Sequence, residues 1–206
     1  MSGIFITFEG GDGSGKTTQI TELAKWLEGQ GKSVCVTREP GGTDLGLELR
    51  DIILHSTGFI SPRAEALLYA ADRAHHIHTI VRPALERGEI VVQDRYLDSS
   101  VAYQGAGRVL DSIEVEGLSL WATENLLPDV TFLLDVPASV AKDRHGQSER
   151  KFDRLEAEAL DFHERVRESY LARAKEHPDR IMVLDGTAPI EHIHQLIAQK
   201  VSDLVS

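Results

Sequence analysis

The sequence predicts a single α/β domain with three layers, in which a five-stranded parallel sheet is flanked by helices. Five short runs of apolar and β-branched residues are spread along the chain. Each run is continuously apolar rather than alternating, which is typical of parallel strands covered on both faces. Long helical patterns separate the runs, as crossover connections between parallel strands require. Together these observations indicate the fold class.

The expected strands are Ile4–Phe8, Ser33–Thr37, Glu89–Gln93, Val130–Leu134 and Arg180–Leu184. The expected helices span residues 18–27, 45–54, 62 to about 87, 111–126, 153–177 and 189–204. Ser61 and Pro62 have the form of an N-cap followed by proline at the first helical position. Pro83 is expected to kink the same helix near its end. A chain of 206 residues is long enough for one such domain, spanning 1–206, and too short for two ordinary ones.

The charge of the chain limits the classes of molecule that we expect as partners. There are 22 basic and 33 acidic residues, which gives a net charge of −11. An acidic surface argues against nucleic acid or a membrane as a partner, since both are anionic. The single cysteine, Cys35, excludes an intrachain disulfide. We see no leader before the first strand and no apolar run near 18 residues, so we expect a soluble, cytoplasmic protein.

The stretch Gly10–Thr17 matches the phosphate-binding pattern G-x-x-x-x-G-K-[ST]. It lies between an expected strand and an expected helix, the context in which this loop binds nucleotides. Its glycines let backbone N–H groups converge on an anion, and the helix that follows adds its positive end. We expect ATP to contact Gly10, Gly11, Asp12, Gly13, Ser14, Gly15, Lys16, Thr17 and Thr18. A glycine-rich turn without a ligand is the alternative that the flanking strand and helix disfavour.

Two side chains of this loop have individual roles in such sites. Lys16 is expected to reach the β- and γ-phosphates, and the Thr17 hydroxyl is expected to bind Mg²⁺. Asp94 follows the third expected strand, where its carboxylate can hold the same ion directly or through water. The adjacent Arg95 offers a planar donor group suited to a second phosphate. A surface ion pair at a strand end is the alternative for Asp94 and Arg95.

A polar and basic segment, at about residues 144–154, lies between two helical patterns. It could close over a triphosphate as a lid and bring arginines to the transferring phosphoryl group. It could equally be a solvated loop whose charges pair locally with Glu149 and Asp153.

Taken together, these residues resemble the thymidylate kinases, over nearly the full length of the chain. The matching landmarks are Phe8-Glu9-Gly10, Thr37 to Thr43 (Thr-Arg-Glu-Pro-Gly-Gly-Thr), Ala70 to Arg73, Asp94-Arg95-Tyr96, Ala102 to Gly105 and Asp153 to Glu156. The chain looks like the bacterial form of the family, in which the lid rather than the loop supplies an arginine. The resemblance implies transfer of the γ-phosphoryl group of MgATP to dTMP, and a homodimer formed through helix packing.

The resemblance also implies roles for individual residues, in an acceptor region at about residues 38–110. Tyr69 would stack on thymine, Arg73 would hydrogen-bond the base, and Gln104 would lie beside it. Tyr103 would crowd the 2′ position of the sugar, and Asp12 would contact its 3′-hydroxyl. Arg95 and Arg50 would clamp the acceptor phosphate, and Glu39 and Ser100 complete the expected acceptor set. The expected catalytic residues are Lys16, Arg95, Arg150 and Asp12, and the other lid arginines expected at ATP are Arg144 and Arg154.

Two other functions remain as alternatives. One is a small-molecule kinase on the same scaffold with a different acceptor, which Tyr69, Arg73 and Tyr103 would distinguish. The other is a GTP-dependent switch, but the only asparagine, Asn125, does not belong to an Asn-Lys-x-Asp motif. An Asp-x-x-Gly element is also absent after the third expected strand.

Overall fold

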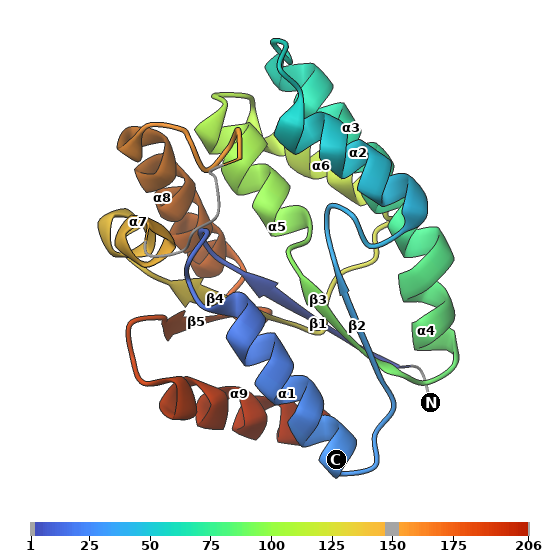
Figure 1. Ribbon diagram of the computed structural model, residues 1–206. Helices are drawn as coiled ribbons and strands as arrows, with labels where there is room; N and C mark the ends of the chain where they lie inside the picture. Colours follow the sequence, from blue (N-terminus) through green and yellow to red (C-terminus); the bar gives the residue numbers. More distant parts are fainter. Residues whose placement is uncertain (1–2, 147–152, 206) are drawn as a thin grey trace.

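A parallel sheet forms the centre of the molecule (Figure 1). The computed structural model describes residues 3–146 and 153–205. Among these residues, five strands pair in the order β2-β3-β1-β4-β5, and every pairing is parallel. The strands are β1 (Ile4–Glu9), β2 (Val34–Arg38), β3 (Ile90–Asp94), β4 (Val130–Asp135) and β5 (Ile181–Asp185). The predicted fold class is confirmed, and each strand lies within one residue of its predicted position.

Helices cover both faces of the sheet. One face carries α1 (Lys16–Gly29) and α9 (Ile190–Val205), which lie side by side below the sheet in Figure 1. The other face carries α4 (Arg82–Glu86), α5 (Leu97–Ser100), α6 (Ser112–Ala122) and α8 (Leu160–Glu176). Within the described ranges, no helix is both long and apolar enough to cross a bilayer.

The core follows from the alternation of side chains along each strand. Ile6 of β1 belongs to one buried cluster with Leu23 of α1 and Ile197 of α9. Its neighbour Phe5 points to the opposite face and packs in a second cluster with Val81. Successive residues of a strand face opposite layers, so a strand between two helical layers must be apolar throughout. This requirement explains the continuous apolar runs.

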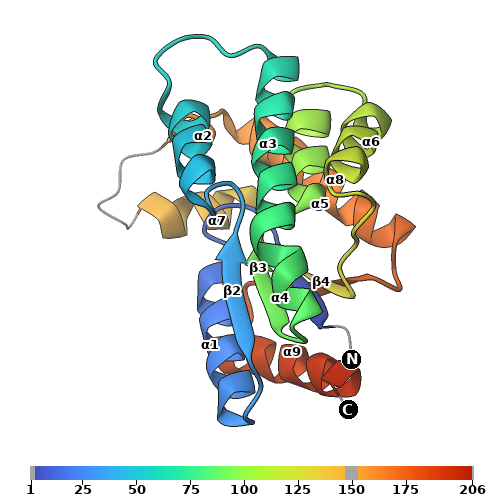
Figure 2. The same cartoon turned by 90° about the vertical axis from the view of Figure 1, so that its right-hand side faces the viewer.

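Two helices extend beyond the carboxyl ends of the strands. They are α2 (Asp44–His55) and α3 (Pro62–His76), which pack together (Figure 2). The Ser61 side chain accepts from the Ala64 N–H and Pro62 opens α3, so the predicted cap is confirmed. α3 continues through a π-helical turn, η1 (Ile77–Val81), into α4, which has Pro83 in its first turn. Since proline lacks an N–H, this shift in hydrogen bonding precedes Pro83 directly.

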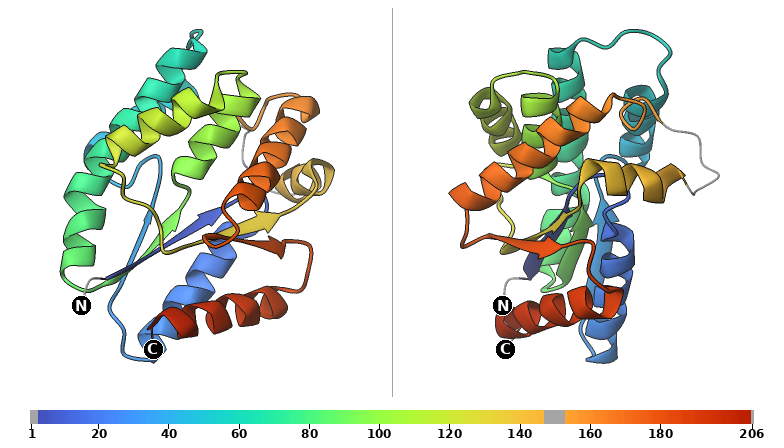
Figure 3. Two further views of the ribbon diagram at one scale, coloured as in Figure 1. Left: turned by 180° about the vertical axis from the view of Figure 1, so that it is seen from behind. Right: turned by 90° about the vertical axis from the view of Figure 1, so that its left-hand side faces the viewer.

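Four helical stretches differ from the prediction. The helix expected at 153–177 begins only at Leu160, because Asp153 Oδ1 accepts from the N–H groups of Leu155 and Glu156 and holds a turn there. α6 ends at Ala122, before Glu124 and Asn125 adopt positive φ. The helical stretch formed by α5 and η2 (Val101–Gly107) was not predicted, and neither were the bounds of α7 (Ala138–Gly146), which packs beside α8 (Figure 3).

Replacement of Ile197 by alanine should lower the free energy of unfolding by about 2–5 kcal/mol, because the side chain is fully buried between α9 and the sheet. Urea denaturation followed by circular dichroism measures this loss. Ile190 lies on the same helix but is 52% exposed, so Ile190→Ala is the matched control and should change stability by less than about 0.5 kcal/mol. Equal losses in the two variants would contradict this description of the core.

Candidate active site

A cavity of about 490 Å³ lies at the carboxyl ends of β1, β2 and β3. The strand register brings these ends together, since Asp94 pairs with Phe8 on one side and with Arg38 on the other. This edge of a parallel sheet is where ligands of such folds bind. Most of the residues predicted from the sequence line the cavity: Asp12, Gly13, Gly15, Lys16, Thr17, Glu39, Arg50, Tyr69, Arg73, Asp94, Arg95, Ser100, Tyr103, Gln104 and Arg144.

Glycine conformation and the Lys16 side chain shape the predicted phosphate-binding loop. Gly13 has φ 79°, and a Cβ there would lie 2.7 Å from the Ala141 carbonyl oxygen, so only glycine fits. The Lys16 Nζ spans the loop and donates to the carbonyl oxygens of Gly10 at 3.0 Å and Gly11 at 2.9 Å. Burial lowers the pKa of Lys16, with Arg95 as the next cause. The loop therefore places one buried cation beside the start of α1.

Arg95 occupies the middle of the site. Its φ of 64° is unusual for a residue with a side chain, and its N–H donates to the Phe8 carbonyl oxygen at 2.9 Å. The guanidinium donates to Asp12 Oδ1 at 2.6 Å and to the Tyr103 hydroxyl at 3.3 Å. Burial alone would raise the pKa of Asp12, but Arg95 and Lys16 hold it well below its usual value. Asp12 is therefore a carboxylate at neutral pH.

Arg73 lies almost fully buried at the wall of the cavity. Its Nε donates to Glu39 Oε2 at 2.7 Å, and its two terminal nitrogens donate to Ser100 Oγ, Ser119 Oγ and the Tyr96 carbonyl oxygen. These bonds use four of the five donors of a guanidinium, which leaves one N–H for a ligand. The guanidinium also lies over the Tyr96 ring, at 5.5 Å from its centroid. The side chain is thus fixed before any ligand binds.

Glu39 links Arg73 to His76. One carboxylate oxygen accepts from Arg73, and the other lies 2.9 Å from His76 Nδ1. The other ring nitrogen of His76 lies 2.7 Å from the Thr37 hydroxyl. Across residues 3–146 and 153–205, no group of three or more histidine, cysteine or acidic side chains could hold a metal ion by itself.

The remaining residues that were expected at the acceptor come from α2, α3 and η2. Arg50 donates to the Pro40 carbonyl oxygen at 2.9 Å, and burial followed by the nearby Arg38 lowers its pKa. Tyr69 lies on α3, one turn before Arg73, and burial raises its pKa. Gln104 is buried, and its Nε2 donates to Glu65 Oε1 at 2.9 Å.

The three arginines that were predicted in the lid differ in their positions relative to the cavity. Arg144 lines the cavity and donates to the Gly186 carbonyl oxygen at 3.0 Å. Arg154 does not line it: its guanidinium donates to the Ile53 carbonyl oxygen and to Glu65 Oε2. Arg150 lies outside the described residues. The remaining expected contacts also lie outside this cavity wall: Gly10, Gly11, Ser14 and Thr18.

Among the residues that were not predicted as part of the site, Arg38 and Ser99 line the cavity, and Tyr170 lies beside it, next to Arg95. Arg38 ends β2 beside Asp94, so its place at a strand end was a signal that could have found it. Ser99 and Tyr170 could not be found this way, because they reach the site from α5 and α8. The Tyr170 hydroxyl lies 3.4 Å from Arg95 and 2.8 Å from Ser99 Oγ.

Glu9, at the end of β1, accepts hydrogen bonds from both Ser99 and Tyr170. It has no exposed surface and accepts from the Tyr96 N–H, Ser99 Oγ and the Tyr170 hydroxyl at 2.8, 2.6 and 2.9 Å. Burial, and then the charge of Asp98, raise the pKa of Glu9 to about 7. The protonated form is therefore favoured by folding.

Glu9→Gln should reduce the loss of stability between pH 5 and pH 8. In the wild type, the pKa of Glu9 is 4.5 in the unfolded chain and about 7 in the folded protein. The contribution of Glu9 to stability is therefore complete below pH 4.5 and falls as the pH rises to 7. Glutamine cannot ionise, so the variant should lose less, by on the order of 2 kcal/mol. Urea denaturation at both pH values measures the difference. Parallel pH profiles for the two proteins would show that Glu9 ionises normally.

Comparisons with known proteins agree with the geometry. The family model "Thymidylate kinase" matches residues 8–197. The thymidylate kinase of Clavibacter sepedonicus is 60% identical over 206 residues, covering 100% of this chain and 98% of the relative. That of Leifsonia xyli subsp. xyli is 64% identical over 191 residues, covering 93% and 90%. The crystal structure of thymidylate kinase from Ehrlichia chaffeensis superimposes with a TM-score of 0.79 at 32% identity, covering 98% of this chain and 99% of that one. With a loop of the phosphate-binding pattern and an arginine-rich cavity at one edge of the sheet, and with these relatives along its whole length, the chain belongs to the thymidylate kinase family of ATP-dependent phosphotransferases.

Proposed function

We propose that the protein transfers the γ-phosphoryl group of ATP to the 5′-phosphate of dTMP, giving dTDP and ADP, through the residues that line the 490 Å³ cavity. The observation that carries the assignment of roles is the position of Arg95. Its guanidinium is bonded to Asp12 of the phosphate-binding loop and to Tyr103 of the proposed acceptor side, so it lies between the two. A cation at that point contacts both anions that the reaction must bring together.

The donor side fits ATP with Mg²⁺. Lys16 reaches along the loop, and the Thr17 side chain at the start of α1 is exposed. Asp94 Oδ1 is buried and has no hydrogen-bond partner among the described residues. A buried carboxylate oxygen without a donor is suited to a cation or its bound water. Thr17 and Asp94 would hold the ion, which would neutralise charge on the β- and γ-phosphates when bound.

The acceptor needs no general base. A phosphate monoester loses its second proton near pH 6, so the attacking oxygen is already largely ionised at neutral pH. What the reaction requires is cancellation of the repulsion between two anions held in line. Lys16, Arg95 and Arg50 supply the charge, and an arginine of the segment at about 144–154 would add to it on closure. Arg144 already lines the cavity, whereas Arg154 is held by Glu65.

The wall opposite the loop suits a pyrimidine deoxynucleotide. Tyr69 offers a ring for stacking, and Arg73 keeps one donor for a carbonyl oxygen of the base. The Tyr103 hydroxyl is bonded to Asp12 Oδ2 at 3.2 Å, which places the ring beside the carboxylate proposed to contact the sugar. A 2′-hydroxyl would meet this ring, so the pocket favours deoxyribose.

We also propose that the protein is a cytoplasmic homodimer. Three apolar side chains are exposed on neighbouring helices: Leu67 of α3 is 56% exposed, and Ile113 and Trp121 of α6 are 81% and 78% exposed. Burial of such side chains against a second copy would be favourable. Sedimentation velocity tests this: Trp121→Glu should yield monomers, and an unchanged sedimentation coefficient would place any interface elsewhere.

The proposed acceptor is tested by ADP release with MgATP and a panel of dTMP, dUMP, dCMP, dGMP, AMP and UMP. The highest kcat/KM is expected with dTMP, and a lower value with dUMP, because the two share every polar group of the base and sugar. A preference for another acceptor would retain the kinase but contradict the proposed base pocket.

Arg95→Ala should lower kcat by at least about 100-fold, because it removes the cation between the two phosphates. The KM for ATP should change by less than about threefold, since Lys16 and the loop hold the donor. Arg87→Ala is the matched control, because Arg87 is exposed and lies at the opposite end of the sheet, before β3. Loss of ATP binding in Arg95→Ala, with kcat retained at saturation, would contradict this role.

A further inference from the structure

A third buried glutamate, Glu65 of α3, lies behind the wall of the base pocket. It has no exposed surface and does not itself line the cavity. Its Oε1 accepts from Gln104 Nε2 at 2.9 Å and from Arg108 Nε at 3.2 Å. Its Oε2 accepts from a terminal nitrogen of Arg154. Two side chains from the end of η2 and one from the segment before α8 thus converge on one carboxylate.

The acceptor oxygens of Glu65 fix the orientation of the Gln104 amide. Its two oxygens accept from Arg108 and Arg154, whose guanidinium groups can only donate, so each oxygen acts as a hydrogen-bond acceptor. The Gln104 atom next to it must therefore be the nitrogen, because an oxygen there would leave two acceptors in contact without a donor. Gln104 lines the cavity, so the polar group that it has left for a ligand is its carbonyl oxygen, Oε1.

The direction of this amide determines which base the wall can read. Arg73 offers a donor and Gln104 offers an acceptor. Thymine and uracil present a carbonyl oxygen at position 4 and an N–H at position 3, which complement this pair. Cytosine presents an amino group and an unprotonated nitrogen at these positions, which is the reverse pattern. A pocket with fixed polar groups rejects the reversed pattern because they would be left unpaired.

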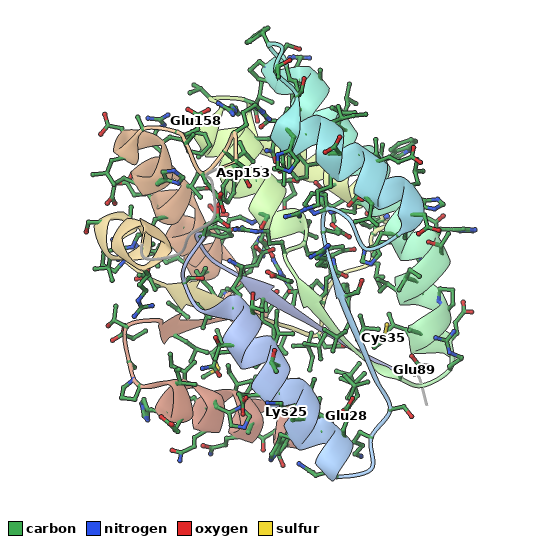
Figure 4. The ribbon with its side chains drawn as sticks, in the orientation of Figure 1. Lys25, Glu28, Cys35, Glu89, Asp153 and Glu158 are labelled. Carbon is green, nitrogen blue, oxygen red and sulfur yellow. The ribbon has the colours of Figure 1, made fainter. Side chains whose placement is uncertain are left out.

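We propose that Glu65 is a specificity-determining positioning residue, which selects thymine and uracil over cytosine by holding the Gln104 amide in one orientation. This inference rests on the proposed placement of the base beside Gln104. Glu65 does not contact the base in this account, and it acts only through Gln104. Since Arg154 and Arg108 share the same carboxylate, they hold it in place. Figure 4 labels Asp153, the residue before Arg154, and Glu158, which lies two residues before the start of α8.

The test is Glu65→Gln. A glutamine has one oxygen for three donors, so at least one donor must find another partner. Gln104 alone among the three can respond by turning its amide, which would present its NH₂ group to the cavity. The ratio of kcat/KM for dTMP to that for dCMP should then fall by at least about tenfold. The ratio for dTMP to dUMP should stay within about twofold, because these two bases differ only in the C5 methyl group.

Glu158→Gln is the matched control. Glu158 pairs with Arg108 at 2.5 Å but does not contact Gln104, so both ratios should remain at the wild-type values. An equal fall in kcat/KM for all three acceptors in Glu65→Gln would overturn the proposal, because it would mean that Glu65 has only a structural role. Gln104→Met separates the two hypotheses: if it leaves the ratio of dTMP to dCMP unchanged, the base does not lie beside Gln104 and the proposed placement fails.

A measurement on the unaltered protein decides the question if Glu65→Gln does not fold. In the complex with dTMP, the ¹⁵N–¹H signals of the Gln104 side chain can be assigned by their loss in Gln104→Met. An amide held by a carboxylate should rotate slowly and exchange its protons with water more slowly than an exposed glutamine such as Gln30. Rapid rotation and exchange would overturn the proposal.

Discussion

The parallel pairing of β1 with β3, in the register that joins Phe8 to Asp94, is the constraint on which the site depends. It places the phosphate-binding loop and the Asp94-Arg95-Tyr96 turn side by side at one edge of the sheet. The Arg95 N–H continues the pairing by donating to Phe8, and the left-handed backbone there costs about 1–2 kcal/mol for a residue with a side chain. The ion pair with Asp12 and the contacts with Tyr103 offset this cost. A shift of one residue in the register would separate the two halves of the site.

Buried glutamates fix the orientation of the polar side chains around the cavity. Glu39 holds Arg73, Glu65 holds Gln104, and Glu9 accepts from Ser99 and Tyr170, which lie next to Arg95. Each carboxyl group is buried and is bonded to several partners, as a polar group away from water requires. The result is a preorganised cavity in a protein of net charge −11, with the cations of Lys16, Arg38, Arg50 and Arg95 facing the space in which two anions would meet.

Local sequence patterns were sufficient for the sheet and for the loop. The apolar runs predicted each strand correctly because both faces of a parallel sheet are covered. The glycines at 10, 13 and 15 have the positive φ that the loop pattern implies. Patterns failed where a tertiary or side-chain contact decided the structure. Periodicity extended the helix back to Asp153, but the bonds from its carboxylate to two N–H groups form a turn instead. The partner of Arg154 is Glu65, 89 residues earlier in the chain, and no local spacing could reveal that pairing.

The proposed contact between Arg95 and the acceptor phosphate is the role on which the rest of the proposed reaction depends. A crystal structure of the protein with dTMP and a non-hydrolysable ATP analogue tests it most directly. We expect the Arg95 guanidinium to contact the 5′-phosphate of dTMP, and the 2.6 Å bond to Asp12 Oδ1 to lengthen or break, leaving the Asp12 carboxylate to the sugar. If Arg95 keeps its bond to Asp12 while Arg50 alone holds the phosphate, Arg95 organises the loop and does not take part in the transfer.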